Sequence, residues 1–415
     1  MHDGLLETLE YAATRIPYYR RTLGTRWRRG LTALPVLTKA QAIAHQAELV
    51  LPGLAPFTGI VSSGTSVREG PVLRVPRLPP EREAQRALLA RHPATAPRRV
   101  LEVHAAHHGL DRPAPLDDRV RVPWTYSTTA LRAVERALFA PRGAPVTHLA
   151  INAGALMPLT IALQRKGRAL RRLRLASIST TGFRLSPHWR AVVEQAWGAR
   201  TYDNYSLSEL PAPALECDAC GFNHFLPPPM VAELVDPLTF APVGQGPGVL
   251  VLTTLFPFVQ AMPLIRYWTG DLAQRGPVCA ATKTRGFRVL GRRTQSLITR
   301  AGVLVAAQHV TDALEPEPLV ARHLHPLERL GLVPHADCGA VKSEVAMTRS
   351  GPRVRVELKF EPSAHGRTAQ ALGERIAARL LAASPALRRL ERSRRGELEV
   401  NLVPPGTLED RWSKW

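Results

Sequence analysis

The stretch Thr147–Gly182, THLAINAGALMPLTIALQRKGRALRRLRLASISTTG, decides the fold class. Two short apolar runs, THLAINAG and LRLASIST, flank LMPLTIALQRKG, whose apolar residues recur at helical spacing. A strand, a helix and a second strand in this order form a crossover unit, which joins parallel strands. RRVLEVHA and STTALRAVERALFA before this stretch, and PHWRAVVEQAWG after it, continue the alternation. We therefore predict an α/β fold with mainly parallel sheets.

The sequence changes character near Arg292–Gln295. Beyond this point VRVELKFEP and GELEVNLVPPG alternate as strands do, and TAQALGERIAARLLAAS between them has helical spacing. A unit of about a hundred residues is the size of a minor domain. We predict a large N-terminal domain, residues 1–293, and a small mobile α+β domain, residues 294–415. The first fifty residues predict two helices, with Thr38 as an N-cap.

The chain has 415 residues, a net charge of +21 and 55 basic residues, of which only six are lysine. The arginine-rich runs are spread along the chain and lack the interleaved aromatic residues of a base-stacking surface. Solvated arginine faces are therefore favoured over a nucleic-acid interface, although the charge would attract an anionic ligand. Four cysteines do not imply a disulfide scaffold, and neither a membrane span nor a signal-peptide pattern is visible. These features favour a cytoplasmic protein.

Four motifs follow one another along the chain: SSGTS at Ser62–Ser66, YDNYSLSEL at Tyr202–Leu210, IRYWTGDLA at Ile265–Ala273 and VLGRRTQSLI at Val289–Ile298. Each alone has a plain structural interpretation. SSGTS can be a turn, Ser206 and Glu209 can form a capping box at a helix start, and Gly-Asp is common in turns. Their joint order and spacing resemble the adenylate-forming superfamily of acyl-CoA synthetases and adenylation domains, and within it the phenylacetate–CoA ligase-like branch. PYYRR, LPVLTKAQ and VPPGTLED also resemble that branch.

The resemblance implies ATP-dependent activation of a carboxylic acid, aromatic or heteroaromatic as in the branch, to an acyl-adenylate. Transfer to a thiol, expected to be coenzyme A, would follow. A serine- and glycine-rich loop would hold the β- and γ-phosphates, an aromatic face the adenine, and carboxylates the ribose and a Mg²⁺ ion. The matching residues are Ser62, Ser63, Gly64, Thr65 and Ser66 for the phosphates, Ser208 near the α-phosphate, Tyr205 for adenine, Thr180, Thr181 and Gly182 along the adenine and acyl pocket, Asp271 for ribose, Arg292 for the nucleotide, and Glu209 for Mg²⁺.

The chain also departs from the family pattern. The lysine usually found after the phosphate loop is missing, with Arg68 in its neighbourhood. Thr294-Gln295 stands where paired acidic residues mark the hinge between the domains. Lys414 is the one match to the catalytic lysine, which would bridge the acyl carboxylate and the α-phosphate, and the alternative for it is a frayed tail.

The cysteines suggest a metal. Cys217-x₂-Cys220-x₃-His224 and the later Cys279 could supply four ligands to a structural zinc ion, because a Cys-x₂-Cys turn brings two thiolates to one ion. The related ligases often carry a Cys/His cluster in this region. The alternative is a pair of buried thiols in a turn, and Cys338 is expected to be an ordinary buried thiol.

Other groups stay open. His104, His107 and His108 are expected to have a lining or structural role, and Trp124, Tyr126 and Trp189 are candidates to line an acyl pocket. Three alternative functions are adenylyl transfer to a phenolic or other oxygen acceptor, binding of nucleic acid by a basic protein, and nucleotide binding without turnover. A homodimer is also left open.

Overall fold

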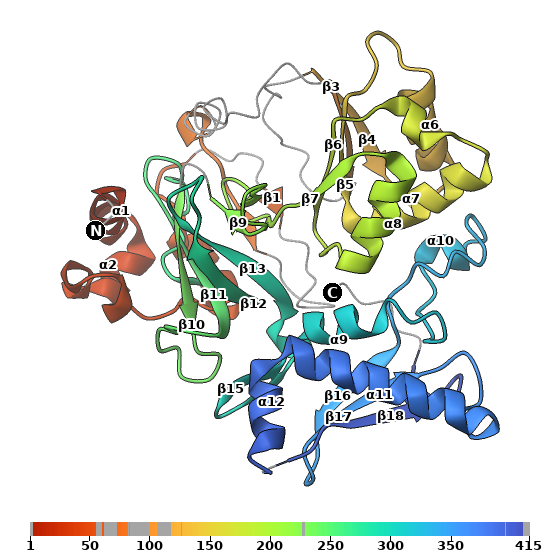
Figure 1. Cartoon of the computed structure of the whole chain (residues 1–415). Helices are drawn as coiled ribbons and strands as arrows, with labels where there is room; N and C mark the ends of the chain where they lie inside the picture. Colours follow the sequence, from red (N-terminus) through yellow and green to blue (C-terminus); the bar gives the residue numbers. More distant parts are fainter. Residues whose placement is uncertain are drawn as a thin grey trace.

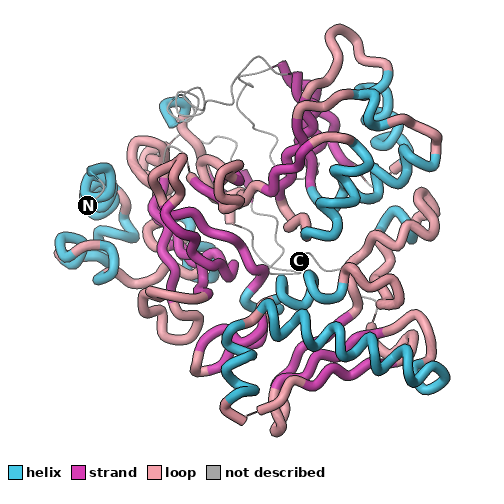
Figure 2. The backbone as a smooth tube through the Cα atoms, in the orientation of Figure 1, coloured by secondary structure: helices cyan, strands magenta, loops and turns pink. Residues whose placement is uncertain are grey.

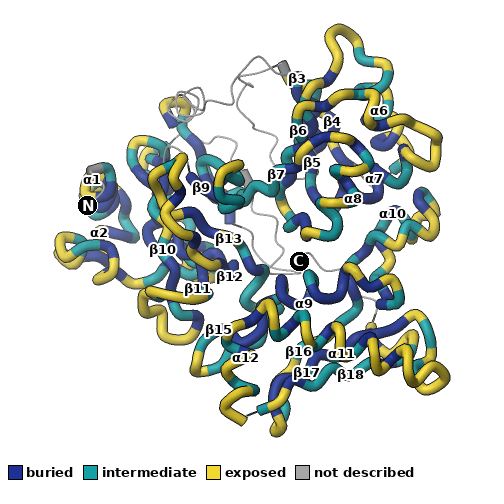
Figure 3. Tube along the Cα trace, viewed as in Figure 1, coloured by how far each residue is buried: buried dark blue, intermediate teal, exposed yellow. Residues whose placement is uncertain are grey.

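The computed structural model describes residues 3–54, 60–61, 73–81, 83, 99–105, 118–125, 127–225, 229–394 and 396–409. Figure 1 shows the N-terminal helices beside an antiparallel sheet, a parallel sheet with its own helices, and a further group of strands and helices formed by the C-terminal third of the chain. Most helices border the parallel sheet and the C-terminal group of strands (Figure 2). Exposed residues gather on loops and outer helix faces, while the strands are largely buried or half-buried (Figure 3).

The stretch that decided the fold class forms the middle of a five-stranded parallel sheet. The strand order is β4-β3-β5-β6-β7. The strands are β3 (Arg99–Ala105), β4 (Asp118–Trp124), β5 (His148–Asn152), β6 (Ser177–Thr181) and β7 (Arg200–Asp203), and the helices are α6 (Thr128–Phe139), α7 (Ala153–Arg165) and α8 (Pro187–Trp197), with a 3₁₀ turn, η3, at Leu170–Leu173. Apolar residues of all three helices share one buried core with the strands, among them Leu138, Leu156 and Trp197. The predicted α/β fold class is confirmed.

A second sheet has six strands in the order β10-β11-β12-β13-β9-β8, and its paired strands are antiparallel. Its strands are β8 (Leu215–Glu216), β9 (Asn223–His224), β10 (Met230–Val235), β11 (Pro247–Thr254), β12 (Tyr267–Val278) and β13 (Arg285–Arg292). Short connections between consecutive strands allow hairpins, whereas parallel pairing needs a long crossover. The large N-terminal region therefore combines one parallel and one antiparallel sheet.

The N-terminal helices pack on the second sheet. They are α1 (Asp3–Arg15), α2 (Pro17–Leu23), α3 (Lys39–Ala44) and α4 (Gln46–Leu49), with 3₁₀ turns η1 (Arg26–Arg29) and η2 (Leu31–Ala33), and a two-stranded ladder of β1 (Ile60–Val61) and β2 (Arg74–Val75) follows. The Tyr19 hydroxyl donates to the Pro263 carbonyl at 3.1 Å within their shared core. The predicted N-cap is confirmed, because Thr38 and Gln41 form a reciprocal capping box at the start of α3.

The C-terminal third contains a three-stranded sheet of order β16-β17-β18 and a two-stranded ladder, β14-β15. Its elements are η4 (Arg293–Gln295), β14 (Leu297–Thr299), β15 (Gly302–Val305), α9 (Ala307–Leu314), α10 (Pro326–Arg329), β16 (Ser343–Met347), β17 (Pro352–Glu357), η5 (Pro362–His365), α11 (Gly366–Ala383), α12 (Pro385–Arg392) and β18 (Glu399–Val403). Residues from Leu304 to Leu398 share a separate buried core. Leu327 and Val333 instead join the core of the parallel sheet.

Within the described ranges, no helix is both long enough and apolar enough to span a membrane.

Candidate nucleotide site

The carboxyl ends of β6 and β7 bring two of the predicted segments together. The two strands pair in parallel with Thr180 opposite Asp203, and the Asn204 N–H donates to the Thr180 carbonyl at 2.9 Å. The Thr180 hydroxyl donates to Asp203 Oδ1 at 3.2 Å, and the Leu185 N–H donates to the other oxygen of that carboxylate at 3.2 Å. Open α/β sheets bind ligands beyond the carboxyl ends of parallel strands. Thr180, Thr181 and Gly182 lie at this edge of the parallel sheet.

Gly182 allows the chain to turn sharply at this edge. Its φ is +83°, in the left-handed region that favours glycine. A Cβ at this position would collide with the side-chain amide of Asn152. That Asn152 side chain accepts from the Gly154 N–H at 2.9 Å and so caps α7. A larger residue at position 182 would disturb both the turn and the cap.

Three residues from three of the motifs meet: Tyr205 in the loop after β7, Asp271 on β12 and Arg292 on β13. The Tyr205 hydroxyl donates to Asp271 Oδ2 at 2.8 Å, and Arg292 Nε lies 3.1 Å from Asp271 Oδ1. Asp271 and Arg292 are opposite each other across β12 and β13, so sheet register sets the ion pair. The ring of Tyr205 contacts Phe287 edge to face, with the ring centroids 5.5 Å apart. Three predicted nucleotide-binding residues thus form one cluster.

Burial shapes the charges of this cluster. It raises the pKa of Asp271, and the adjacent Arg292 guanidinium opposes the rise. Burial also raises the pKa of Tyr205, and the Asp271 carboxylate adds to the increase. The raised pKa keeps Tyr205 neutral, so its hydroxyl can donate to Asp271.

Glu209 lies next to this cluster in a buried turn. The Tyr267 hydroxyl donates to Glu209 Oε1 at 3.0 Å, and Lys39 Nζ lies 3.4 Å from the same oxygen. The Glu209 carbonyl accepts from Arg77 at 3.1 Å. Both side-chain contacts fall on Oε1, so Oε2 is the oxygen through which Glu209 would bind a hard cation such as Mg²⁺. The donor chemistry fits that ion.

The alternative interpretation of Ser206 and Glu209, a capping box at a helix start, was wrong. Residues 208–210 form a turn, closed by the Leu210 N–H donating to the Leu207 carbonyl at 3.1 Å, and no helix follows in the described segment up to β8. Pro211 and Pro213 explain the difference, because proline disfavours a helical conformation in the residue before it and has no N–H to donate. Ser208 is half-buried in the same turn.

Several predicted residues lie outside the described residues. They are Ser62, Ser63, Gly64, Thr65, Ser66, Arg68, His107, His108, Tyr126 and Lys414, and the side chain of His104 is likewise not described. Trp124, a candidate to line an acyl pocket, is part of the buried core of the parallel sheet. Trp189 packs against that core and lies under the guanidinium of Arg322 at 5.1 Å. Both side chains pack inside the structure.

The predicted metal ligands converge. The ligand atoms of Cys217, Cys220, His224 and Cys279 all lie within 4.8 Å of one another. Sγ of Cys217 is 3.8 Å from Sγ of Cys279, and Sγ of Cys220 is 3.2 Å from Nε2 of His224. Ligands about 2.3 Å from one tetrahedral ion are separated by distances of this order.

The surroundings of these four residues also suit a metal. Nδ1 of His224 lies 2.9 Å from the Thr284 hydroxyl, which orients the ring so that Nε2 faces the thiols. Hydrogen bonding from the Thr282 backbone lowers the pKa of Cys279 to about 6, which favours the thiolate form that zinc binds. Burial raises the pKa of Cys220 to about 11, so a metal would be needed to hold this group as a thiolate. The residues present therefore fit a zinc ion.

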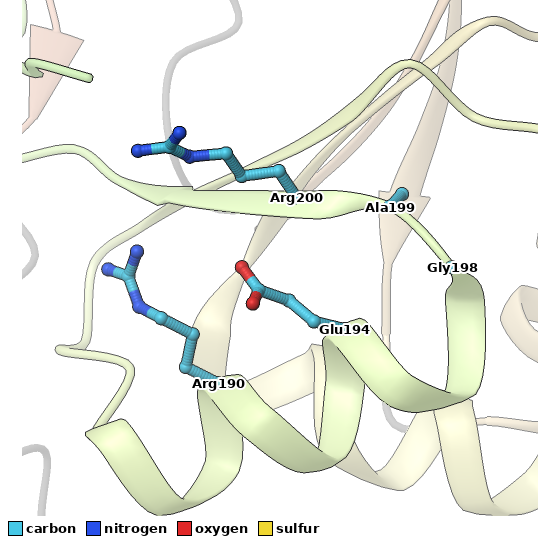
Figure 4. Close-up of a pocket in the computed structure, with 5 residues that line it drawn as sticks. All are labelled: Arg190, Glu194, Gly198, Ala199 and Arg200. Atoms are coloured by element: carbon cyan, nitrogen blue, oxygen red, sulfur yellow. The ribbon is translucent and has the colours of Figure 1, made fainter.

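A shallow hollow elsewhere on the chain is lined by Arg190, Glu194, Gly198, Ala199 and Arg200 (Figure 4). Its charged groups have partners in the protein. Arg190 donates to Glu216 at 2.7 Å, and Glu194 accepts from the Thr201 N–H at 2.8 Å. Arg200 lies 3.0 Å from Asp218. These contacts give each charged side chain that lines the hollow a structural role.

Sequence reasoning did not include Lys39, Tyr267 or Asp203 in the site. Asp203 and Tyr267 lie within quoted motifs, and Lys39 lies in LPVLTKAQ, so each was close to a recognised signal. The contacts of these three residues are visible only in the folded structure, because spacing along the chain does not indicate them.

No family model matches the chain. It is 34% identical over 230 residues to a phenylacetate–coenzyme A ligase of Thermus thermophilus, covering 52% of this chain and 47% of that protein. Over 165 residues it is 34% identical to the phenylacetate–coenzyme A ligase of Escherichia coli, covering 38% of this chain and 36% of that protein. The chain thus spans less than half of the length of these relatives.

Structural similarity extends over nearly the whole chain. An open conformation of a 2-hydroxyisobutyryl-CoA ligase, in complex with 2-HIB-AMP and CoA, superposes with a TM-score of 0.68 at 15% identity. The match covers 98% of this chain and 88% of that one. The chain therefore has the fold of the adenylate-forming CoA ligases and is related in sequence, over about half of its length, to phenylacetate–CoA ligases.

Proposed function

We propose that the protein is an AMP-forming acid–thiol ligase, which converts a carboxylic acid and ATP into an acyl-adenylate and then transfers the acyl group to coenzyme A. The meeting of Tyr205, Asp271 and Arg292 beside a buried Glu209 carries the proposal. A carboxylate can accept both ribose hydroxyls, and an aromatic ring offers a flat face to adenine. The names of the sequence relatives support an aryl-substituted acid as the substrate.

The residues of this chain would bind and orient the nucleotide. Asp271 would hold the ribose, Tyr205 the adenine and Arg292 the nucleotide from the neighbouring strand, with Ser208, Thr180, Thr181 and Gly182 around them. Ser62–Ser66 would contact the phosphates, and Lys414 remains the proposed match to the catalytic lysine. Mg²⁺ on Glu209 would neutralise phosphate charge when bound.

We further propose that residues 294–415 act as a mobile lid above residues 1–293, excluding water from the acyl-adenylate. The cluster of Cys217, Cys220, His224 and Cys279 is proposed to hold a structural zinc ion. Since ATP and coenzyme A are intracellular substrates, a cytoplasmic location belongs to the same proposal.

A panel of acids tests the function. Pyrophosphate release from Mg·ATP is measured with phenylacetate, benzoate and short aliphatic acids, each with and without coenzyme A. We expect one acid to stimulate release and to yield its CoA thioester. Glu209→Ala should abolish release, whereas Glu344→Ala, which removes an exposed carboxylate paired with Arg355, should not. Acid-independent formation of an AMP–phenol adduct would support adenylyl transfer instead. Nucleotide binding without turnover of any acid would contradict the ligase proposal.

A further inference from the structure

Lys39 is a half-buried cation that the four sequence motifs do not include. Its Nζ lies 3.4 Å from Glu209 Oε1, and the two side chains are 23% and 6% exposed. It also opposes the rise that burial causes in the pKa of Asp271, so its charge is felt by both carboxylates. Lys39 therefore connects the N-terminal helices to the candidate nucleotide site.

The backbone that carries Lys39 is held in place on both sides. On one side, Thr38 and Gln41 cap α3, where Lys39 is the first helical residue. On the other, the Leu37 N–H donates to the Arg266 carbonyl, and the Trp268 N–H donates to the Leu37 carbonyl, each at 2.9 Å. These bonds fasten position 37 to β12, the strand that also contains Tyr267 and Asp271. The lysine is thus placed by a rigid element, as a site residue requires.

Stability alone does not explain why the chain places the Lys39–Glu209 ion pair largely out of solvent. Desolvating two charges costs about as much as their attraction returns, so such a pair is weak evidence for a stabilising role. A site that binds ATP has a different need, because the triphosphate brings several negative charges into a confined space. Asp271 and Glu209 add two more, and the described cations that contact their side chains are Arg292 and Lys39, while Arg77 contacts the Glu209 carbonyl.

We propose that Lys39 is a catalytic residue of the ligase, whose ammonium contacts the phosphates of ATP beside Glu209. The inference rests on the proposed function and deepens it. It accounts for a departure noted in the sequence, where the lysine expected after the SSGTS loop is missing. A lysine ammonium is a compact point charge suited to phosphate oxygens.

The step needs no proton transfer from Lys39. A carboxylate oxygen of the acid attacks the α-phosphorus, the bond from that phosphorus to the bridging oxygen breaks, and pyrophosphate leaves with the bonding electron pair. The ammonium keeps its three protons and stabilises the negative charge on the phosphate oxygens in the transition state.

Binding and rate measurements on Lys39→Met and Lys39→Arg test the proposal. Calorimetry gives the dissociation constants of Mg·ATP, of ATP in EDTA and of adenosine, and pyrophosphate release gives the adenylation rate. For Lys39→Met we expect ATP binding to weaken at least about tenfold with or without Mg²⁺, with adenosine binding unchanged. Adenylation should slow by about 10²- to 10³-fold. Lys39→Arg should recover most of the ATP affinity.

Lys342→Met is the matched control. Lys342 also pairs with a buried glutamate, with its Nζ 3.0 Å from Glu357 Oε1, but it lies in the C-terminal sheet region. Its removal should leave ATP affinity unchanged. The double variant Lys39→Met/Glu209→Gln separates a structural role from a phosphate contact. Neutralising both partners should restore thermal stability but not the Mg²⁺-free affinity for ATP.

The outcomes are distinct. Wild-type ATP affinity and adenylation rate in Lys39→Met, or restored affinity in the double variant, would show that Lys39 only neutralises Glu209. If the wild type binds ATP but activates no acid, the ligase proposal fails, while the affinities still decide the phosphate contact. If the wild type binds no ATP at all, both proposals are overturned.

Discussion

Asp271, the proposed ribose ligand, is already engaged by other side chains of the folded protein. Its two carboxylate oxygens are each engaged, one by Tyr205 and the other by Arg292. Ribose hydroxyls would therefore share or replace the tyrosine contact rather than enter an empty site. The Arg292 pair, set by strand register, would keep the carboxylate charged and oriented.

This residue makes a specific prediction about the sugar. Hydrogen bonds to a charged group contribute about 1.5–3 kcal/mol, so wild-type protein should bind ATP roughly 10- to 100-fold more tightly than 2′,3′-dideoxy-ATP. In Asp271→Asn the two nucleotides should bind almost equally, because the charged acceptor is gone. Calorimetry measures both affinities. Asp337→Asn, at an exposed residue paired with Lys359, is the control and should keep the preference for ATP. An unchanged preference in Asp271→Asn would remove Asp271 from the ribose site.

At the scale of elements, two hairpin-like turns bring the four proposed zinc ligands together. The Gly221 N–H donates to the Cys217 carbonyl at 2.8 Å, and the Lys283 N–H donates to the Cys279 carbonyl at 2.9 Å. One turn lies between β8 and β9 and the other between β12 and β13. A metal bound by all four residues would therefore connect the turn between β8 and β9 to the turn between β12 and β13.

Zinc content tests that arrangement. Purified protein should contain about one zinc ion per chain, and Cys220→Ser should lose it and melt roughly 5 °C lower or more, because the sheet edge loses its cross-link. Elemental analysis and thermal melting measure the two effects. Cys338→Ser should retain zinc, since Cys338 packs against the parallel-sheet core outside the cluster. Metal-free wild type with four titratable thiols would favour the alternative of simple buried thiols.

At the scale of the whole molecule, contacts join the regions on either side of residue 293. Arg184, after β6, lies 3.2 Å from Asp312 on α9, and Ser186 donates to Glu315. Nε2 of His325 donates to the Gly154 carbonyl at 3.1 Å, because its Nδ1 accepts from the Leu327 N–H. Any rotation of a lid in this protein would have to break these contacts.

Glu315 makes this interface sensitive to pH. Burial raises its pKa from the ordinary 4.5 to about 7, with the Ser186 hydrogen bond opposing the rise. Between these two values the folded protein holds a proton that the unfolded chain has released. The stability from this group is thus greatest below about pH 4.5 and falls as the pH rises to about 7.

Glu315→Gln removes this titration. Relative to wild type, the variant should gain up to about 3 kcal/mol in free energy of unfolding between pH 5 and 7, and the difference should level off by pH 8. Urea unfolding at several pH values measures it. Glu344→Gln, at an exposed position, should show no such trend. A difference that stayed constant across this range would place the Glu315 pKa near its ordinary value.

Much of the fold followed from local patterns. The crossover units, the Thr38 cap and the C-terminal strands and helices could be predicted because periodicity and capping act over a few residues. The alternative interpretation of Ser206 as a helix start failed because two prolines downstream outweighed the capping pattern. The antiparallel arrangement of β8–β13 was not predicted, since pairing direction depends on connections between distant strands rather than on any one strand.

The amino-acid sequence by itself determined the fold class and pointed to the residues that we propose for nucleotide binding, because hydrophobic period and motif order are written along the chain. Only the tertiary structure decided that the Lys39 ammonium and the Tyr267 hydroxyl both contact Oε1 of Glu209. Residues 39 and 209 are brought together by the packing of α3 on β12, and no local pattern encodes that packing. The distance between these residues and their burial are properties of the folded chain. This is why Lys39 could not be found from sequence spacing.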